Sequence, residues 1–256
     1  MHACRPLTVV LALLTLSESA HAQGWADRRQ IGPVTVRSAF SLTAFEPLLV
    51  EVLEVRAALT THLGVPAVDS PIEIYLLADE RSYRRYLGRH FPDVPYRRAL
   101  FIKARGRIVV LAYRHKDLAT DLRHESTHAF LHSALPMVPL WLDEGLAEYF
   151  EAPPSVRAGG NAHLNAMRWY ARFGRSPSLI RLEAITDLSQ MGPREYRESW
   201  AWVHFCMHGP KSAHDALVAY LADIRRHTPP GNLSDRLTRS LGSPRAQLAA
   251  HLRKVK

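Results

Sequence analysis

Residues 117–134 read DLATDLRHESTHAFLHSA, a pattern that predicts one helix, which Pro136 ends. This helix contains His124, Glu125 and His128 in the spacing His-Glu-x-x-His. Residues four apart lie on one face of a helix, so both imidazoles can point at one ion. Apolar residues flank the string, which indicates that one face of the helix is buried. Two unrelated histidines on a surface helix are the alternative, and the neighbouring sequence has to decide.

Glu125 follows His124 directly and so lies about 100° further around the helix. It would stand beside the ion rather than on it. A carboxylate in that position can accept a proton from a water molecule that the ion activates. The string therefore predicts Glu125 as the catalytic general base.

A second helix is predicted over residues 140–151, LWLDEGLAEYFE, after a short turn around Pro136 to Pro139. A helix–turn–helix can bring Glu144 back over the two histidines, and Gly145 would allow close helix packing. Two imidazoles and one carboxylate leave a fourth position open, as in catalytic zinc sites. The predicted cofactor is one Zn²⁺, and its predicted ligands are His124, His128 and Glu144.

Two further carboxylates on this helix are candidates for orienting the metal ligands. Glu148 lies one turn after Glu144 and could accept the free ring N–H of His124. Asp143 could do the same for His128. An ordinary solvated helix face is the alternative for both.

The two helices together resemble the gluzincin metallopeptidases, on His124-Glu125-x-x-His128 and on the string from Trp141 to Tyr149. More narrowly, residues 70–206 are similar to the peptidase-MA-like group of exported bacterial proteins, many of unassigned substrate. The resemblance implies Glu144 as the third zinc ligand and Glu125 as the base. The chain has Asp143 where the clan commonly has asparagine. It also lacks the Gly-x-Met-Glu-Asn string of the clan's aminopeptidases, which argues against that activity.

Gluzincins usually supply a donor for the oxyanion of the tetrahedral intermediate. Tyr196 is the first candidate here, because the resembling group tends to carry a tyrosine in that region; a packed core tyrosine is the alternative. Tyr149, His204 and His208 are further candidates. Two further aromatic pairs are predicted to be core, with a binding box as the alternative: Trp169 with Tyr170 and Trp200 with Trp202.

Residues 31–36 predict a short strand that Gly32-Pro33 breaks at its start. Residues 46–63 predict a helix, residues 72–77 a strand and residues 79–87 a helix capped by Asp79. Residues 99–103 and 107–113 predict a β-hairpin around Arg105-Gly106, which could offer an edge strand to an extended peptide. Further helices are predicted at 164–173, 179–185, 194–208, 212–227, 233–241 and 244–254.

These patterns predict an α+β fold: a small mixed α/β N-terminal subdomain with a β-hairpin edge, then a mostly helical subdomain. It would be zincin-like, with the His-Glu-x-x-His helix at the junction. The predicted domains are a signal peptide over 1–22, the mixed subdomain over 23–116 and the helical metal-site subdomain over 117–256.

The first residues predict export. Arg5 precedes an apolar run over residues 7–16, and Ala20-His21-Ala22 ends the pattern, as in a cleaved secretory signal peptide. The run is shorter than the ~20 residues that a membrane-spanning helix needs. The mature chain is therefore expected in the periplasm or secreted. After cleavage only Cys206 remains, and its apolar neighbours predict a buried residue rather than a nucleophile.

The chain is basic, with a formal net charge of +9, but no block of five or more like charges occurs. That spread argues against a nucleic-acid partner and favours a solvated surface, with weak attraction to an anionic envelope surface as the sharper alternative. The sequence predicts a zinc metallohydrolase, a peptidase acting on peptide or peptide-like substrates. The rival hypothesis is a non-catalytic cell-envelope binding or assembly module that retains a zincin-like fold.

Overall fold

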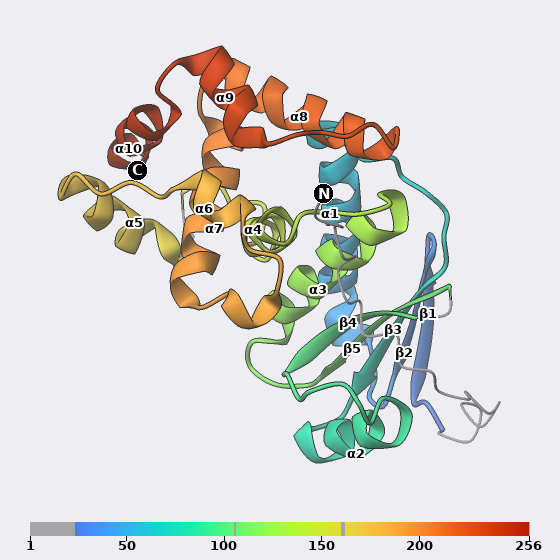
Figure 1. Cartoon of the computed structure of the whole chain (residues 1–256). Helices are drawn as coiled ribbons and strands as arrows, with labels where there is room; N and C mark the ends of the chain where they lie inside the picture. The colour runs from blue at the N-terminus through green and yellow to red at the C-terminus, as the bar shows by residue number, and fades with distance from the viewer. Residues whose placement is uncertain (1–23, 105, 160–161, 256) are drawn as a thin grey trace. The chain divides into compact units, whose positions relative to one another are not determined.

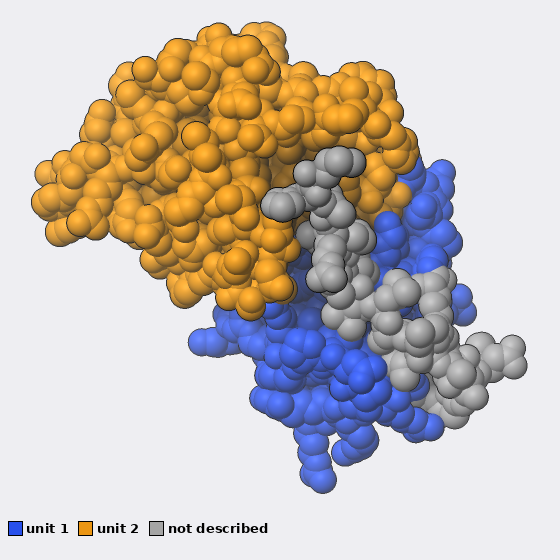
Figure 2. Space-filling view, in the orientation of Figure 1, with its two compact units in different colours: residues 1–55, 68–129 blue, residues 56–67, 130–256 orange. Residues whose placement is uncertain are grey.

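The computed structural model describes residues 24–104, 106–159 and 162–255. They form an α+β fold, with a five-stranded mixed sheet in the N-terminal part and a mostly helical region after it, as predicted (Figure 1). The described residues form two compact units (Figure 2): unit 1 holds those within 24–55 and 68–129, and unit 2 holds those within 56–67 and 130–255. The predicted signal peptide lies outside the described residues.

The sheet of unit 1 combines parallel and antiparallel pairs in the order β1-β2-β3-β5-β4. The central strand β3 runs parallel to β2 and β5, while β1 and β4 are antiparallel to their neighbours. Parallel neighbours need a crossover, and helix α1 (Glu46–Leu63) supplies it between β2 and β3. The strands are β1 (Asp27–Ile31), β2 (Val34–Ser38), β3 (Ile72–Leu77), β4 (Ala99–Ala104) and β5 (Arg107–Tyr113). The predicted hairpin is therefore confirmed, with β4 at the sheet edge.

The strand predicted over residues 31–36 is confirmed only from Val34 onward, because the chain reverses at Gly32-Pro33 and Ile31 belongs to the preceding strand. β1 and β2 form a hairpin in which Ile31 pairs with Val34. The two turn residues are Gly32 and Pro33, and Gly32 has a φ of +53°. A glycine with positive φ at the first central position is what a tight hairpin turn of this kind requires. The Gly-Pro pair thus ends one strand and begins the next.

Helix α2 (Glu80–His90) lies against β3 and β5 and buries an aromatic face there (Figure 1). Its Tyr83 is fully buried and packs with Tyr75 and Leu111 of the sheet in one apolar cluster. The predicted cap is confirmed: the Asp79 side chain accepts a hydrogen bond of 2.7 Å from the Ser82 backbone N–H. Burial of each large apolar side chain contributes roughly 1.5–3 kcal/mol, so this cluster stabilises one face of the sheet.

Two helices carry the predicted metal-binding strings, and both lie within a residue of their predicted bounds. They are α3 (Leu118–Ala134) and α4 (Leu140–Phe150). The division between the compact units falls within α3, after Ala129, whereas the predicted subdomain boundary precedes that helix.

Unit 2 is helical, and α7 lies at its centre, in contact with α4, α5, α6, α8 and α10. The helices that follow α4 are α5 (His163–Arg172), α6 (Leu179–Glu183), α7 (Pro193–His208), α8 (Lys211–Arg225), α9 (Leu233–Leu241) and α10 (Pro244–Lys254). Two short 3₁₀ segments complete the elements, η2 (Thr43–Phe45) and η3 (Leu188–Gln190). None of the described helices is long and apolar enough to span a bilayer.

Helices α4 and α7 of unit 2 approach each other closely at Gly145. A Cβ atom added there would lie 2.9 Å from the backbone oxygen of Ser199. Real Cβ contacts are longer than that, so only glycine fits without a shift of the backbone. The predicted role of Gly145 in close packing is confirmed.

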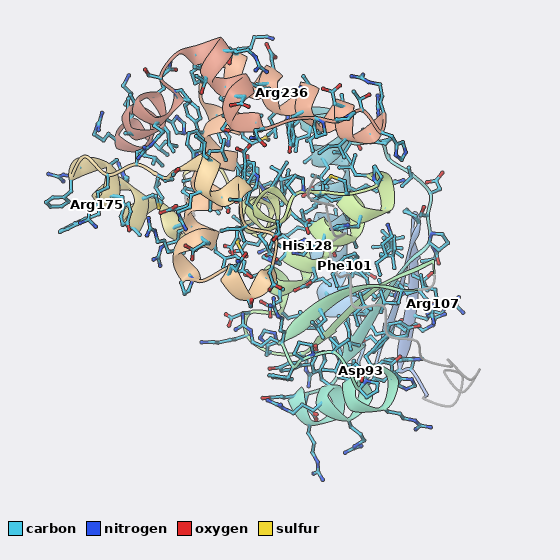
Figure 3. The ribbon with its side chains drawn as sticks, viewed as in Figure 1. Asp93, Phe101, Arg107, His128, Arg175 and Arg236 are labelled. Carbon is cyan, nitrogen blue, oxygen red and sulfur yellow. The ribbon has the colours of Figure 1, made fainter. Side chains whose placement is uncertain are left out.

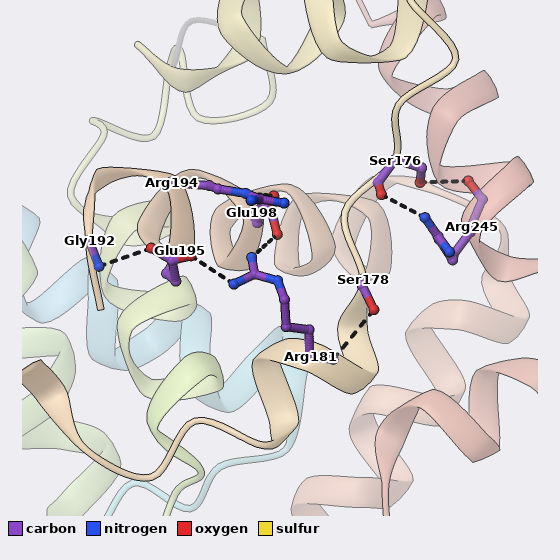
Figure 4. A network of polar contacts seen from close by, with 8 residues as sticks. All are labelled: Ser176, Ser178, Arg181, Gly192, Arg194, Glu195, Glu198 and Arg245. Carbon is purple, nitrogen blue, oxygen red and sulfur yellow. Dashed lines mark hydrogen bonds and ion pairs between the residues drawn. The ribbon is translucent and has the colours of Figure 1, made fainter. Parts of the chain in front are cut away.

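A network of charged side chains ties α6 to α7 (Figure 4). Glu198 is almost fully buried and accepts hydrogen bonds from Arg181 at 2.5 Å and from Arg194 at 2.7 Å. Arg181 also donates to Glu195 at 2.7 Å. Buried carboxylates require such partners because an uncompensated buried charge is costly. Trp200 and Trp202, two and four residues after Glu198, are buried as predicted, and Cys206 is buried as well.

Candidate metal centre

Helix α3 presents His124, Glu125 and His128 on neighbouring positions of its surface. The two imidazole centroids are 5.0 Å apart, with the ring planes at 73°, as expected for residues one turn apart. His128 is buried, whereas His124 and Glu125 are half-buried. The Phe101 ring of strand β4 stacks on the His128 ring, with centroids 6.0 Å apart (Figure 3). Packing between helix and edge strand therefore holds one imidazole in place.

Ion pairs within unit 1 anchor the first turns of α3. The buried Arg123 guanidinium donates to Glu51 of α1 at 2.5 Å. Asp121 accepts from Arg98 at 2.9 Å, and the His115 ring lies 3.2 Å from the same carboxylate. These contacts restrict the rotation of α3 about its axis, which sets the direction in which its histidines point.

A buried tyrosine of α2 lies within electrostatic range of Glu125. Burial raises the pKa of Tyr83, and the negative charges of Glu125 and Asp121 raise it further. Tyr83 is therefore a neutral phenol throughout the ordinary pH range. Sequence reasoning missed this neighbour of the predicted base, because only the packing of α2 on the sheet brings it near α3.

Glu144 of α4 is a buried carboxylate, only 6% exposed. The ligand atoms that His124, His128 and Glu144 offer lie within 4.8 Å of one another. Two imidazole nitrogens and one carboxylate oxygen are a donor set that suits zinc and leaves room for a fourth ligand. These residues therefore fit the metal that the sequence predicts.

His124 belongs to a second group of this kind, with Glu148 and Glu151, whose ligand atoms also lie within 4.8 Å of one another. All three residues are only half-buried, and exposed acidic groups commonly gather without an ion. One imidazole with two carboxylates is the poorer zinc set, since carboxylates favour harder cations. We therefore take Glu144 as the better third ligand.

The two predicted orienting carboxylates both contact histidines. Glu148 is 2.6 Å from His163 Nε2, in addition to its place near His124. Asp143 is 2.9 Å from His132 Nε2. His132 lies one turn beyond His128. Asp143, which the sequence predicts to contact His128, therefore contacts the next histidine of the same helix. The sequence showed no spacing that would single out His132 or His163 as carboxylate partners, because these contacts join separate segments.

Tyr196 lies in the first turn of α7 and is half-buried. Its role as oxyanion donor stays a prediction. The other candidates are engaged in a network of their own: Tyr149 is buried and its hydroxyl lies 2.8 Å from His208 Nε2, while His204 donates to the Ala158 carbonyl at 2.8 Å. These hydrogen bonds fix the side chains of Tyr149, His204 and His208 within the packed interior of unit 2.

No protein-family model matches the chain, and no curated protein matches it. The class of the molecule therefore follows from its own fold and donor groups. They describe an α+β chain with a candidate two-histidine, one-carboxylate metal centre.

Proposed function

We propose that this chain is a zinc metallohydrolase, a peptidase of the gluzincin type. The observation that carries the proposal is the group of three ligand atoms from His124, His128 and Glu144 within 4.8 Å, with Glu125 on the same helix as the two histidines. Zinc held there would supply a Lewis acid that polarises a scissile carbonyl and makes water more acidic.

Glu125 is the group that would move the proton. It is adjacent to His124 in sequence but is not part of either candidate ligand group. Its carboxylate can therefore accept a proton from the attacking water and pass it to the leaving amine. A purely structural metal site has no need of a carboxylate at that position, so Glu125 favours catalysis over mere binding.

Strand β4 supports a peptide as the substrate. It lies at the end of the described sheet, with β5 as its neighbour in the sheet order. An extended peptide can add to such an edge through main-chain hydrogen bonds. Phe101 belongs to this strand and stacks on His128, so a peptide on the edge would run close to the imidazole. The predicted signal peptide over residues 1–22 makes an exported, periplasmic or secreted chain the expected setting.

Zinc analysis and one variant test the proposal. The mature chain, residues 23–256, should contain one zinc per chain and cleave members of a peptide library. Glu125→Gln should retain the zinc and lose hydrolysis by at least ~100-fold, since general-base catalysis contributes about that much or more. The matched control is Glu54→Gln, an exposed glutamate of α1, which should leave both properties unchanged.

Two outcomes would contradict the proposal. Unchanged turnover in Glu125→Gln would remove Glu125 as the base. A mature chain that takes up no zinc on reconstitution would favour the rival function, a non-catalytic module of the cell envelope.

A further inference from the structure

Helix α5 has two apolar faces, and only one of them is covered. Leu164, Met167 and Ala171 are buried where α5 contacts α7 and α10. On the opposite side Trp169 is 66% exposed and Phe173 is 63% exposed, with their ring centroids 4.4 Å apart. The prediction that Trp169 belongs to the core is therefore wrong, because the 3.6-residue period turns it away from the buried side.

Positive charge surrounds this aromatic pair. Arg172 and Arg175 are exposed, and Arg168 is half-buried. Figure 3 shows Arg175 at the tip of this part of unit 2. Its guanidinium carbon lies 5.9 Å from the centroid of the Tyr170 ring. Among the residues that the structure describes, no carboxylate forms an ion pair with any of these three arginines.

The exposed aromatic pair is held on ordered structure. The Arg253 side chain of α10 donates to the Ala171 carbonyl at 3.2 Å, which satisfies one carbonyl at the end of α5. Ser176 and Arg245 exchange two hydrogen bonds of 3.0 Å, which tie the segment after Phe173 to α10 (Figure 4). The outward position of Trp169 and Phe173 therefore belongs to the folded state and is not the fraying of a helix end.

Such a surface has the chemistry of a lipid interface. The transfer of an exposed aromatic side chain from water to an apolar phase has a favourable free energy. Trp in particular favours the boundary between headgroups and acyl chains. Arginines beside them complement anionic headgroups, and the net charge of +9 acts in the same direction. We propose that Trp169 and Phe173, together with Arg168, Arg172 and Arg175, form a docking surface for an anionic phospholipid membrane. The proposal does not depend on the metal centre.

Vesicle flotation of the mature chain, residues 23–256, tests this surface. The chain should bind vesicles of phosphatidylcholine with phosphatidylglycerol and not vesicles of phosphatidylcholine alone. Trp169→Ser with Phe173→Ser should lower the partition coefficient at least ~10-fold, since both rings would leave the interface. Arg172→Gln with Arg175→Gln should lower it roughly 25-fold, about 5-fold for each charge near the membrane surface.

Matched controls change the same kinds of group elsewhere. Val50→Ser with Met137→Ser removes two other exposed apolar side chains, and Arg225→Gln with Arg239→Gln removes two other exposed charges. Both control pairs should bind vesicles nearly as the parent chain does, and zinc content should be equal in all variants.

Three results would overturn the proposal: no binding to anionic vesicles, equal loss in the control variants, or retained binding in the Trp169 and Phe173 variant. Light scattering provides the remaining test. A dimer that becomes a monomer in that variant would show that the surface binds a second copy of the chain instead.

Discussion

Two helices of this molecule each carry a pair of histidines four residues apart, and the two pairs have different surroundings. In α3 the rings of His124 and His128 have centroids 5.0 Å apart, and in α7 those of His204 and His208 are 4.7 Å apart. By spacing alone both pairs could hold an ion. The groups around each pair decide what it can do.

The α7 pair is bonded to neutral groups. His204 donates through Nε2 to the Ala158 carbonyl, and its Nδ1 lies 2.9 Å from His251 Nε2. His208 contacts the Tyr149 hydroxyl. Burial lowers the pKa of His204 and of His208 to about 4, so both rings are neutral at pH 7. The α3 pair has the Glu144 carboxylate within 4.8 Å of its ligand nitrogens. A paired spacing therefore aligns two rings, while a nearby anion marks the pair that suits a cation.

The largest expected difference between the pairs is in zinc affinity. Glu144→Ala or His128→Ala should weaken zinc binding by more than ~100-fold, since even loss of an orienting contact costs ~10–100-fold. His208→Ala should leave the affinity within a few-fold of the parent value. Competition with a chromogenic chelator measures all three. Wild-type affinity in Glu144→Ala would remove Glu144 from the ligand set.

The next difference is in the pH dependence of stability. His204, His208 and His251 have pKa values lowered from 6.5 to about 4 in the folded chain. Between these values the unfolded chain binds more protons, so stability is full above about pH 6.5 and falls as the pH drops towards 4. A shift of this size in one group, such as that of His204, corresponds to on the order of 3 kcal/mol of stability.

Urea unfolding at about pH 7 and about pH 5 measures this loss. His204→Gln keeps a donor and an acceptor but does not titrate, so its unfolding free energy should change less between the two pH values. An equal pH dependence in parent and variant would contradict the assignment of the loss to His204.

Helix α4 carries Glu144, which is grouped with the α3 pair, and Tyr149, which contacts the α7 pair. The packing of α4 on α7 should be sensitive to added side-chain volume. Gly145→Ala places a Cβ 2.9 Å from the Ser199 oxygen, a backbone atom that cannot move freely. Destabilisation of about 1–3 kcal/mol is expected by chemical denaturation. Gly88→Ala is the matched control: α2 has open space there, and alanine should stabilise by roughly 0.5–1 kcal/mol. A neutral Gly145→Ala would show that α4 can shift without cost.

The smallest expected effect concerns the Tyr149 hydroxyl, which contacts His208 of the α7 pair. Tyr149→Phe removes the 2.8 Å contact with His208, and the unfolding free energy should fall by about 1 kcal/mol. Zinc affinity should stay unchanged, because the contact belongs to the structural pair. Tyr170→Phe, at a half-buried tyrosine, is the control and should have little effect. A large loss of zinc in Tyr149→Phe would contradict the separation of the two pairs.

Much of the fold could be predicted because local signals determine helices. Periodic apolar residues, caps and prolines placed the helices to within one or two residues at most ends, including α3 and α4. The hairpin of β4 and β5 followed from alternation around a Gly turn. The β1–β2 hairpin was missed because a Gly-Pro pair can break a strand or reverse it, and only pairing with a partner strand decides which.

The candidate site divides in the same way. The sequence by itself determined the α+β class and the string that places His124, Glu125 and His128 on one helix, because residues within two turns of a helix have known relative positions. Tertiary structure alone decided that Asp143 contacts His132 and that Tyr83 lies near Glu125. It likewise decided that His204 bonds to His251 and that His208 contacts Tyr149. It also decided that Trp169 is exposed. These facts depend on contacts between segments far apart in the chain, and no local pattern encodes which segments will meet.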